Sequence, residues 1–192
     1  MRFQRVASLL VVLALILVIR ASTLPAPAEA APTVPQSTTT RISVAADGAE
    51  AEGASYTPAF SSDGTRVAFI SDAENLTTDP ISGTRQVFVK ELASGAVTLA
   101  SVSTAGVPGD GDADAPALSS DGGQVVFESY ATNLISGTVN SWLDVFVHDT
   151  TTLTTTQISV ASDGTPGNST SENPALSADG RYVVFQSNAY NL

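Results

Sequence analysis

A seven-residue segment recurs three times along the 192-residue chain, always at a spacing of 58 residues. The copies occupy residues 58–64, 116–122 and 174–180 and read P-A-F-S-S-D-G, P-A-L-S-S-D-G and P-A-L-S-A-D-G. Shorter motifs return at the same spacing: V-A-F or V-V-F, then N-L, and V-F-V in the first two copies. A constant spacing without insertions indicates an array of equivalent supersecondary units.

Each copy has the pattern of four short strands. In the first copy we expect strands at about residues 58–61, 66–71, 86–90 and 96–102. A tight turn at S-D-G separates the first two, because Asp caps its own backbone and Gly accepts positive φ. The middle strands are apolar on both faces, so they need another sheet packed on each side. Four-stranded units stacked radially meet that need, so an all-β propeller is predicted, with a β-sandwich or a solenoid as the alternative.

The motif P-A-[FL]-S-[SA]-D-G-x-x-V-[AV]-F-x-S, followed by V-F-V, resembles the repeat of TolB-type propellers, a WD-like repeat family of bacterial exported proteins. The resemblance covers residues 42–192 and implies blades of four antiparallel strands. It implies no particular activity, because similar blades serve as scaffolds, as ligand-binding modules and as gates in front of peptidase domains. No residue carries a role over from the family.

The repeats divide the chain into full copies at 42–99 and 100–157 and a shorter third copy at 158–192. The third copy contains only the first two expected strands of a blade, so we expect an incomplete propeller. Closed propellers have about four to eight blades, and exposed sheet edges pair with other chains. We therefore expect the segment 31–192 to self-associate or to be only marginally folded.

The first thirty residues are typical of a signal peptide. A basic start precedes an apolar run at 6–19, and an A-x-A cleavage pattern ends at Ala30. The run spans about 21 Å as a helix, short of the roughly 30 Å of a bilayer core. We expect residues 1–30 to be removed on export to the periplasm, the cell envelope or the medium, and 31–41 to form a flexible lead-in. A retained N-terminal anchor, which would be the chain's one contact with a membrane, is the alternative.

The chain is acidic and has no cysteine. It carries 19 Asp and Glu against 8 Lys and Arg, which gives a formal net charge of −11. This charge opposes binding to nucleic acid, which needs clustered cations against the phosphates. The lack of cysteine excludes disulfides, thiolate metal sites and cysteine nucleophiles. His148 is the single histidine, so an H-E-x-x-H zinc helix is excluded, and we expect no cofactor.

A serine hydrolase finds no support in the sequence. The nucleophile elbow G-x-S-x-G is absent: the nearest segments, 53–57 and 167–171, end in threonine and serine instead of glycine. The single histidine, His148, aligns with Lys90 on the third expected strand. At this position we expect an exposed polar side chain without a catalytic role.

The stretch Asp110-Gly-Asp112-Ala-Asp114 is the best candidate for a metal site, because hard cations bind several carboxylate oxygens. A calcium loop requires glycine at its sixth position, where Ala115 stands, and the acidic triplet is not repeated in the other copies. We interpret the stretch as a solvated acidic loop, with a weak calcium site as the alternative.

Two other features are candidates for chemistry. Asp63, Asp121 and Asp179 recur in every copy, and recurrence favours a structural role in the turn over catalysis. Trp142 occurs only in the second copy, where it could stack on a sugar ring or cap the edge of the blade, which we favour. The sequence thus predicts no catalytic, cofactor-binding or metal-ligating residue.

We therefore expect an exported, non-catalytic propeller module, and not an enzyme, that binds another protein or a cell-envelope component or serves as a scaffold. Two alternatives stay open. The chain could be the propeller portion of a larger hydrolase of the prolyl-oligopeptidase kind, or a sugar-binding propeller. A nucleophile elbow beyond residue 192 would favour the hydrolase, and binding on a glycan array would favour the sugar.

Overall fold

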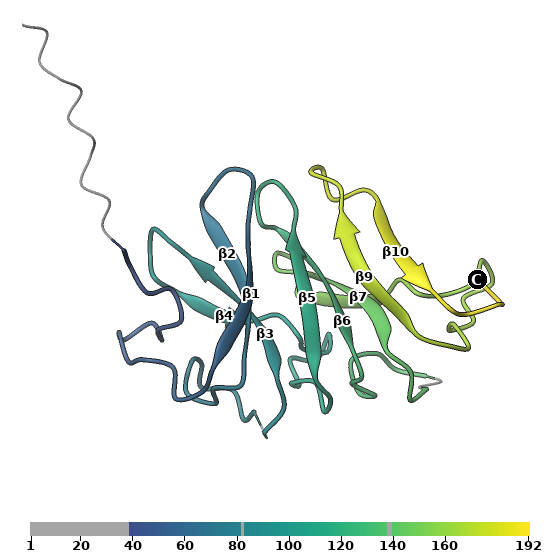
Figure 1. Ribbon diagram of the computed structural model, residues 1–192, viewed down its shortest axis with the longest axis horizontal. Coiled ribbons are helices and arrows are strands. Elements are labelled where there is room, and N and C mark those ends of the chain that lie inside the picture. Colours follow the sequence, from purple (N-terminus) through teal and green to yellow (C-terminus); the bar gives the residue numbers. More distant parts are fainter. Residues whose placement is uncertain (1–38, 82, 138–139) are drawn as a thin grey trace, which may run out of the picture. The chain divides into compact units, whose positions relative to one another are not determined.

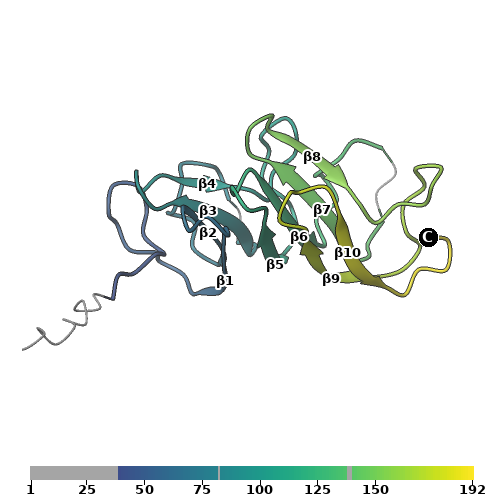
Figure 2. The ribbon, with the colours of Figure 1, turned by 90° about the horizontal axis from the view of Figure 1, so that it is seen from above.

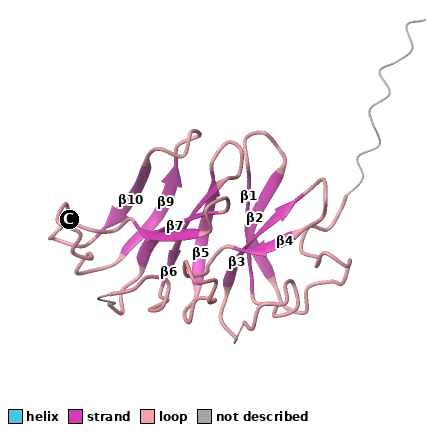
Figure 3. Ribbon diagram, turned by 180° about the vertical axis from the view of Figure 1, so that it is seen from behind, coloured by secondary structure: helices cyan, strands magenta, loops and turns pink. Residues whose placement is uncertain are grey.

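The computed structural model of the protein describes residues 39–81, 83–137 and 140–192. The chain divides into two compact units, Met1–Thr39 and Thr40–Leu192, and the strands of the described residues lie in the second. The expected signal peptide and most of the expected lead-in fall outside the described residues. The described ranges contain strands, turns and loops (Figure 3), and no helix in them is long and apolar enough to cross a membrane.

Two four-stranded antiparallel sheets and a two-stranded hairpin follow one another along the chain (Figure 1). The first sheet, called the first blade, pairs its strands in the order β1 (Ser55–Phe60), β2 (Arg66–Ser71), β3 (Gln86–Glu91) and β4 (Val97–Leu99). The second blade has the same order in β5 (Ala113–Leu118), β6 (Gln124–Ser129), β7 (Asp144–Asp149) and β8 (Thr154–Gln157). The hairpin consists of β9 (Ser171–Leu176) and β10 (Val183–Ser187). The sequence repeat is therefore also the structural repeat.

The first and fourth strands of the first blade differ from their expected bounds. β1 begins at Ser55 rather than at Pro58, because a β-bulge accommodates the proline inside the strand. Thr57 forms the bulge with a φ of 48°. The strand lies at the edge of its sheet, where the missing N–H of a proline is tolerated. β4 ends at Leu99, short of the expected residue 102.

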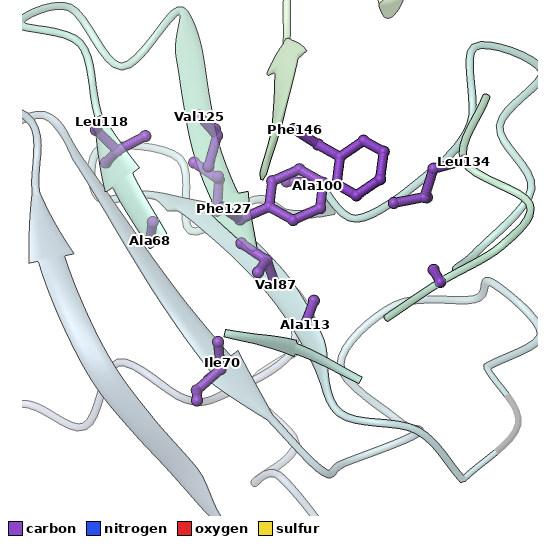
Figure 4. Packing of buried hydrophobic residues seen from close by; sticks show 12 residues of the cluster. Ala68, Ile70, Val87, Ala100, Ala113, Leu118, Val125, Phe127, Leu134 and Phe146 are labelled. Atoms are coloured by element: carbon purple, nitrogen blue, oxygen red, sulfur yellow. The ribbon is translucent and has the colours of Figure 1, made fainter. Parts of the chain in front are cut away.

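The two blades pack face to face, and their contact forms the larger hydrophobic core (Figure 4). Ala68 and Ile70 of β2 belong to one cluster with Leu118, Val125 and Phe127 of the second blade. Every residue of β2 after the first is buried. Burial of each Val, Ile or Phe side chain contributes about 1.5–3 kcal/mol to stability. The middle strands are thus buried on both faces, as expected for stacked blades.

The phenylalanines of the repeated motifs stack across each blade. The rings of Phe69 and Phe88 have centroids 5.8 Å apart, and those of Phe127 and Phe146 are also 5.8 Å apart. The register places each pair directly opposite on neighbouring antiparallel strands. This pairing explains why V-A-F or V-V-F on one strand is always followed by V-F-V on the next in the first two repeats.

Main-chain hydrogen bonds also join successive blades. The N–H of Ala113 donates to the carbonyl of Arg85 at 2.9 Å, and that of Ser171 donates to the carbonyl of Leu143 at 2.8 Å. The two contacts are equivalent at the repeat spacing. Sheets packed in this way succeed one another from the first blade to the hairpin (Figure 2). Two blades and a hairpin are fewer than the roughly four to eight blades of a closed ring, so the described residues form part of a β-propeller.

Candidate binding surface

The three S-x-D-G turns lie at the same end of the sheets (Figure 1). In the first, the Ser61 hydroxyl donates to Oδ1 of Asp63 at 2.7 Å and accepts from the N–H of Arg66 at 2.9 Å. The N–H of Thr65 also donates to that carboxylate, at 2.9 Å. The turns at Asp121 and Asp179 repeat these bonds. The recurring carboxylates therefore cap turns, which is the role their recurrence suggested.

Neighbouring turns are tied together through their backbones. The N–H of Asp63 donates to the carbonyl of Ser120 at 3.0 Å, and the N–H of Ser120 donates to the carbonyl of Ala178 at 2.7 Å. A hollow of about 400 Å³ lies over this junction, and its acidic lining residues, called the acidic rim, are Asp63, Asp121, Asp149 and Asp179. The backbone contacts tie together the turns that carry Asp63, Asp121 and Asp179.

Hydrogen bonds keep the acidic rim ionised. The pKa of Asp63 is lowered chiefly by the Ser61 hydroxyl and that of Asp121 chiefly by the N–H of Gly123. The Ser177 hydroxyl lowers the pKa of Asp179 in the same way. The pKa of Asp149 is also lowered, first by the N–H of Thr152. The rim thus carries four negative charges at neutral pH, which attract cations and basic side chains.

The acidic stretch is engaged elsewhere. Asp110 accepts hydrogen bonds from the N–H and the hydroxyl of Thr132, at 2.6 and 2.7 Å. Burial acts to raise the pKa of Asp110, but these bonds outweigh it and hold the pKa below its usual value. Asp112 accepts from the N–H of Arg85, and Asp114 pairs with the guanidinium of Arg85 at 3.3 Å. Asp110 thus bonds to Thr132, whereas Asp112 and Asp114 both bond to Arg85. The described residues contain no group of three or more His, Asp or Glu placed to hold a metal ion.

The expectation that His148 and Lys90 are exposed is wrong. His148 is 3% exposed, and its Nδ1 lies 2.9 Å from the hydroxyl of Thr155. That hydroxyl donates to the carbonyl of Val102, so the ring nitrogen must be the donor and carries the proton on Nδ1. Lys90 is 7% exposed and donates to the carbonyl of Val44 at 2.7 Å. Lys90 thus bonds directly to the segment that leads into its blade, and His148 is linked to the equivalent segment through Thr155.

His148 and Ser55 each have a hydrogen-bond partner within the fold. Burial lowers the pKa of His148, which keeps the imidazole neutral, but its Nδ1 hydrogen bond goes to Thr155. Ser55, in the nearest approach to an elbow, donates to the hydroxyl of Ser71 at 3.0 Å. In the described ranges no serine hydroxyl bonds to the histidine ring, a contact that a triad requires.

The buried carboxylate of Asp144 also has a structural partner. Its Oδ1 accepts from the Ser159 hydroxyl at 2.7 Å, and burial raises its pKa. The equivalent residue of the first blade is Gln86, whose Oε1 accepts from the Ser101 hydroxyl at 2.5 Å. An amide makes the same contact in the first blade as the carboxylate makes in the second. The side chain at this position therefore holds the backbone in place rather than performing acid–base chemistry.

The recurring asparagines of the N-L motif are structural residues. Oδ1 of Asn133 accepts from the N–H of Asp110 at 3.0 Å, and its Nδ2 donates to the carbonyl of Pro108 at 2.8 Å. Asn75 and Asn191 make the same pair of contacts in the other repeats. Each N-L motif therefore clamps the loop before the first strand of its blade. Recurrence in all three copies was the signal for this role.

Trp142 lies on the surface with 49% of its area exposed. The backbone N–H of Trp142 donates to Oδ1 of Asn140 at 2.8 Å, and Nδ2 of Asn140 donates to the carbonyl of Gly167 at 3.1 Å. The loop that carries the ring is thus tied to the third repeat. The exposed ring is compatible with either role expected of it.

Comparison with known proteins gives matches among solved structures alone: no family model and no curated protein matches the chain. A protein assigned as TolB from Agrobacterium tumefaciens matches 72% of this chain and 40% of its own, with 19% identity and a TM-score of 0.49. The β-propeller domain of the Trilobed protease from Pyrococcus furiosus, described as having an open velcro topology, covers 69% of this chain and 34% of its own, at 16% identity and a TM-score of 0.44.

TolB from Acinetobacter baumannii also matches, over 69% of this chain and 37% of its own, with 16% identity and a TM-score of 0.37. The chain therefore spans between 34% and 40% of the length of these solved chains. These three solved structures are two TolB proteins and a protease propeller domain.

Proposed function

We propose that the chain is exported and serves as a non-catalytic binding or scaffolding module whose acidic rim contacts a basic surface of another protein or of a cell-envelope component. The observation that carries this proposal is the use of the recurring polar residues. Serine, aspartate and asparagine of each repeat hold turns and blade contacts together. The hydrogen bonds described above to Asp63, Asp121 and Asp179 all end on Oδ1. The turns thus hold each carboxylate in place through one oxygen, while its charge faces outward.

A basic partner fits the electrostatics of this end of the molecule. The charge of Arg66 helps to lower the pKa of Asp63 and of Asp121, and its Nη1 already donates to the Gly122 carbonyl and the Thr150 hydroxyl. The ionised rim therefore favours lysine- or arginine-rich surfaces, and binding to them weakens as salt screens the charges.

The test uses substitutions that keep the turns intact. Asp121→Asn with Asp179→Asn preserves Oδ1 as an acceptor and removes two charges from the rim. Asp47→Asn with Asp163→Asn removes two charges from turns outside the hollow, where the same oxygen caps the backbone. Envelope extracts are passed over the immobilised proteins. A component should bind to the wild type and to the Asp47/Asp163 variant, but not to the Asp121/Asp179 variant, and salt should elute it. Equal capture by both variants, or capture indifferent to salt, would remove the rim from the proposal.

The absence of catalysis is tested separately. The purified chain should show no turnover of peptidase, esterase or glycosidase substrates and no labelling by a fluorophosphonate probe. Labelling at a serine, with turnover lost when that serine is replaced by alanine, would overturn the non-catalytic part of the proposal. A glycan array on which Trp142→Ala loses a signal given by the wild type would establish the sugar-binding alternative.

A further inference from the structure

A small cleft lies between β3 and β4 of the first blade and the end of β7 in the second. Its volume is about 180 Å³, and its lining includes Val89 and Thr98 on one side and His148 and Thr150 on the other. This volume corresponds to about six water molecules. Both walls belong to four-stranded sheets, so the cleft is a product of the interface between the two blades.

Arg66 supplies a fixed positive charge at this cleft. Its Nη1 donates to the carbonyl of Gly122 at 2.9 Å and to the hydroxyl of Thr150 at 3.2 Å. Among the described residues Arg66 forms no salt bridge, and no hydrogen bond engages its Nε or Nη2. A guanidinium held through one nitrogen keeps its other donors for a carboxylate, which it binds through two parallel hydrogen bonds.

Glu91 adds a negative charge to the same wall. The register of β2 and β3 places Glu91 directly opposite Arg66, and both residues line the cleft. The two side chains do not form an ion pair: Arg66 bonds to the second blade, and Glu91 accepts from the hydroxyl of Ser94. Two opposite charges that lie side by side without contact suit a ligand that carries both signs.

His148 contributes a hydrogen-bond acceptor from the facing blade. Its Nδ1 carries the proton and bonds to Thr155, so Nε2 holds a lone pair. The residue is 3% exposed and lines the cleft, and within the described ranges no hydrogen bond engages Nε2. A lone pair in so enclosed a place needs a hydrogen-bond donor, which a ligand in the cleft can supply.

Leu153 forms an apolar part of the cleft in an unfavourable conformation. Its φ is 57°, in the left-handed region, where the equivalent residue of the first blade is Gly95 with a φ of 76°. A leucine is disfavoured there because its Cβ crowds the backbone. Its side chain lines the cleft although the residue is largely exposed. Glycine would serve the turn better, so the leucine indicates a role in the cleft.

We propose that this cleft binds a small α-amino acid as a zwitterion. The free donors of Arg66 hold the carboxylate, and the ammonium group donates to Glu91 and to Nε2 of His148. A short side chain packs against Leu153. The volume admits an amino acid of the size of glycine or alanine and excludes a large aromatic one. None of the four aspartates of the acidic rim lines the cleft, so this site is separate from the proposed contact with a basic surface.

An NMR titration tests the site directly. His148 is the single histidine, so in a chain produced without a histidine tag its two ring C–H signals report on the cleft alone. L-Alanine should shift both signals saturably. Acetate and methylammonium, which each carry one of the two charges, should shift them much less, and L-tryptophan should not shift them. Signals that do not respond saturably to L-alanine or glycine, or that respond equally to acetate, overturn the proposal.

Two variants separate binding from folding. Glu91→Gln keeps an acceptor for Ser94 and removes the charge, whereas Leu153→Gly removes the apolar contact and relieves the unfavourable φ. Each should weaken the binding of L-alanine by about tenfold, because one loses a charge-assisted hydrogen bond and the other a buried apolar contact. Glu50→Gln, at an exposed glutamate outside the cleft, is the control and should bind as the wild type does.

Denaturant unfolding accompanies these titrations. Leu153→Gly should be at least as stable as the wild type, since glycine adopts the left-handed conformation without strain. A loss of binding in this variant therefore cannot be ascribed to unfolding. Wild-type affinity for L-alanine in both Glu91→Gln and Leu153→Gly, or an equal loss of affinity in Glu50→Gln, contradicts the proposal.

Discussion

The side chain of Arg66 lies against the backbone of Gly122, to whose carbonyl its Nη1 donates at 2.9 Å. The contact links the second strand of the first blade to the turn of the second. It depends on the absence of a side chain at residue 122, where φ is +66°. Blade contact and turn geometry thus require the same glycine.

Gly122→Ala is therefore expected to destabilise the protein by more than a left-handed alanine alone would. The left-handed conformation costs about 1–2 kcal/mol for a residue other than glycine, and the clash with Arg66 adds to it. Gly106→Ala is the control, since φ there is +76° and nothing lies within 4 Å of an added Cβ. Denaturant unfolding measures both, and Arg66→Ala should relieve part of the Gly122→Ala effect in the double variant. Equal losses for the two alanines would show that the contact with Arg66 contributes nothing.

Replacing His148 by alanine should also destabilise the protein. The buried ring fills space between the strand and the covering segment and donates to the Thr155 hydroxyl. Loss of this hydrogen bond and of the packing is expected to lower the free energy of unfolding by about 2 kcal/mol. Leu153→Ala, at a residue that is 61% exposed, is the control and should change stability little. An unchanged unfolding midpoint for His148→Ala would mean that the ring is not buried in solution.

His148 should make stability depend on pH. Burial lowers the pKa of His148 in the folded state below its ordinary value of 6.5, whereas the unfolded chain keeps that value. Below pH 6.5 the unfolded state therefore binds the proton first, and stability falls until the pH passes the folded-state pKa. Thermal melts of the wild type and His148→Gln between pH 8 and pH 5 should diverge as the pH drops, with the wild type losing more. If the melting temperatures of the two proteins fell in parallel with pH, His148 would not be the source of the pH dependence.

Asn133→Ala should detach the loop that precedes the second blade. Two hydrogen bonds, to Asp110 and Pro108, are lost, at about 1 kcal/mol each. Asn133→Asp keeps the acceptor for Asp110 but loses the donor to Pro108, so its effect on unfolding should be intermediate and should lessen at acid pH. Amide hydrogen exchange should show faster exchange at residue 110 in the alanine variant, and unchanged exchange there would contradict the clamp.

Export predicts a defined N-terminus. In an exporting host the mature chain should begin at Ala31, because the apolar run is short and the A-x-A pattern ends at Ala30. Mass spectrometry of the periplasmic and extracellular fractions measures this. Recovery of the intact segment 1–30 in the membrane fraction would instead support the anchor.

The repeat made the fold predictable, but not the burial of its polar residues. Strands that are apolar on both faces must be covered by other sheets, and a turn with positive φ favours glycine. Composition and spacing were therefore enough to predict the stacked strands and the S-D-G turns. His148 was misjudged because a polar residue that ends an apolar strand normally points to water, whereas here a segment from 46 residues earlier covers it. The rim was equally hidden, because spacing alone does not show that Asp149 joins the three turn aspartates.

The bulge of β1 recurs at Ala115 and Asn173, with φ values of 49° and 54°, each followed by proline. Strands β1, β5 and β9 end the strand order of their sheets, so their outer backbones could act as templates for fibril growth. A kinked residue next to one without an N–H interrupts the regular ladder that such growth needs. The bulge and its proline therefore make the outer edge of each blade's first strand a poor template for pairing with another chain.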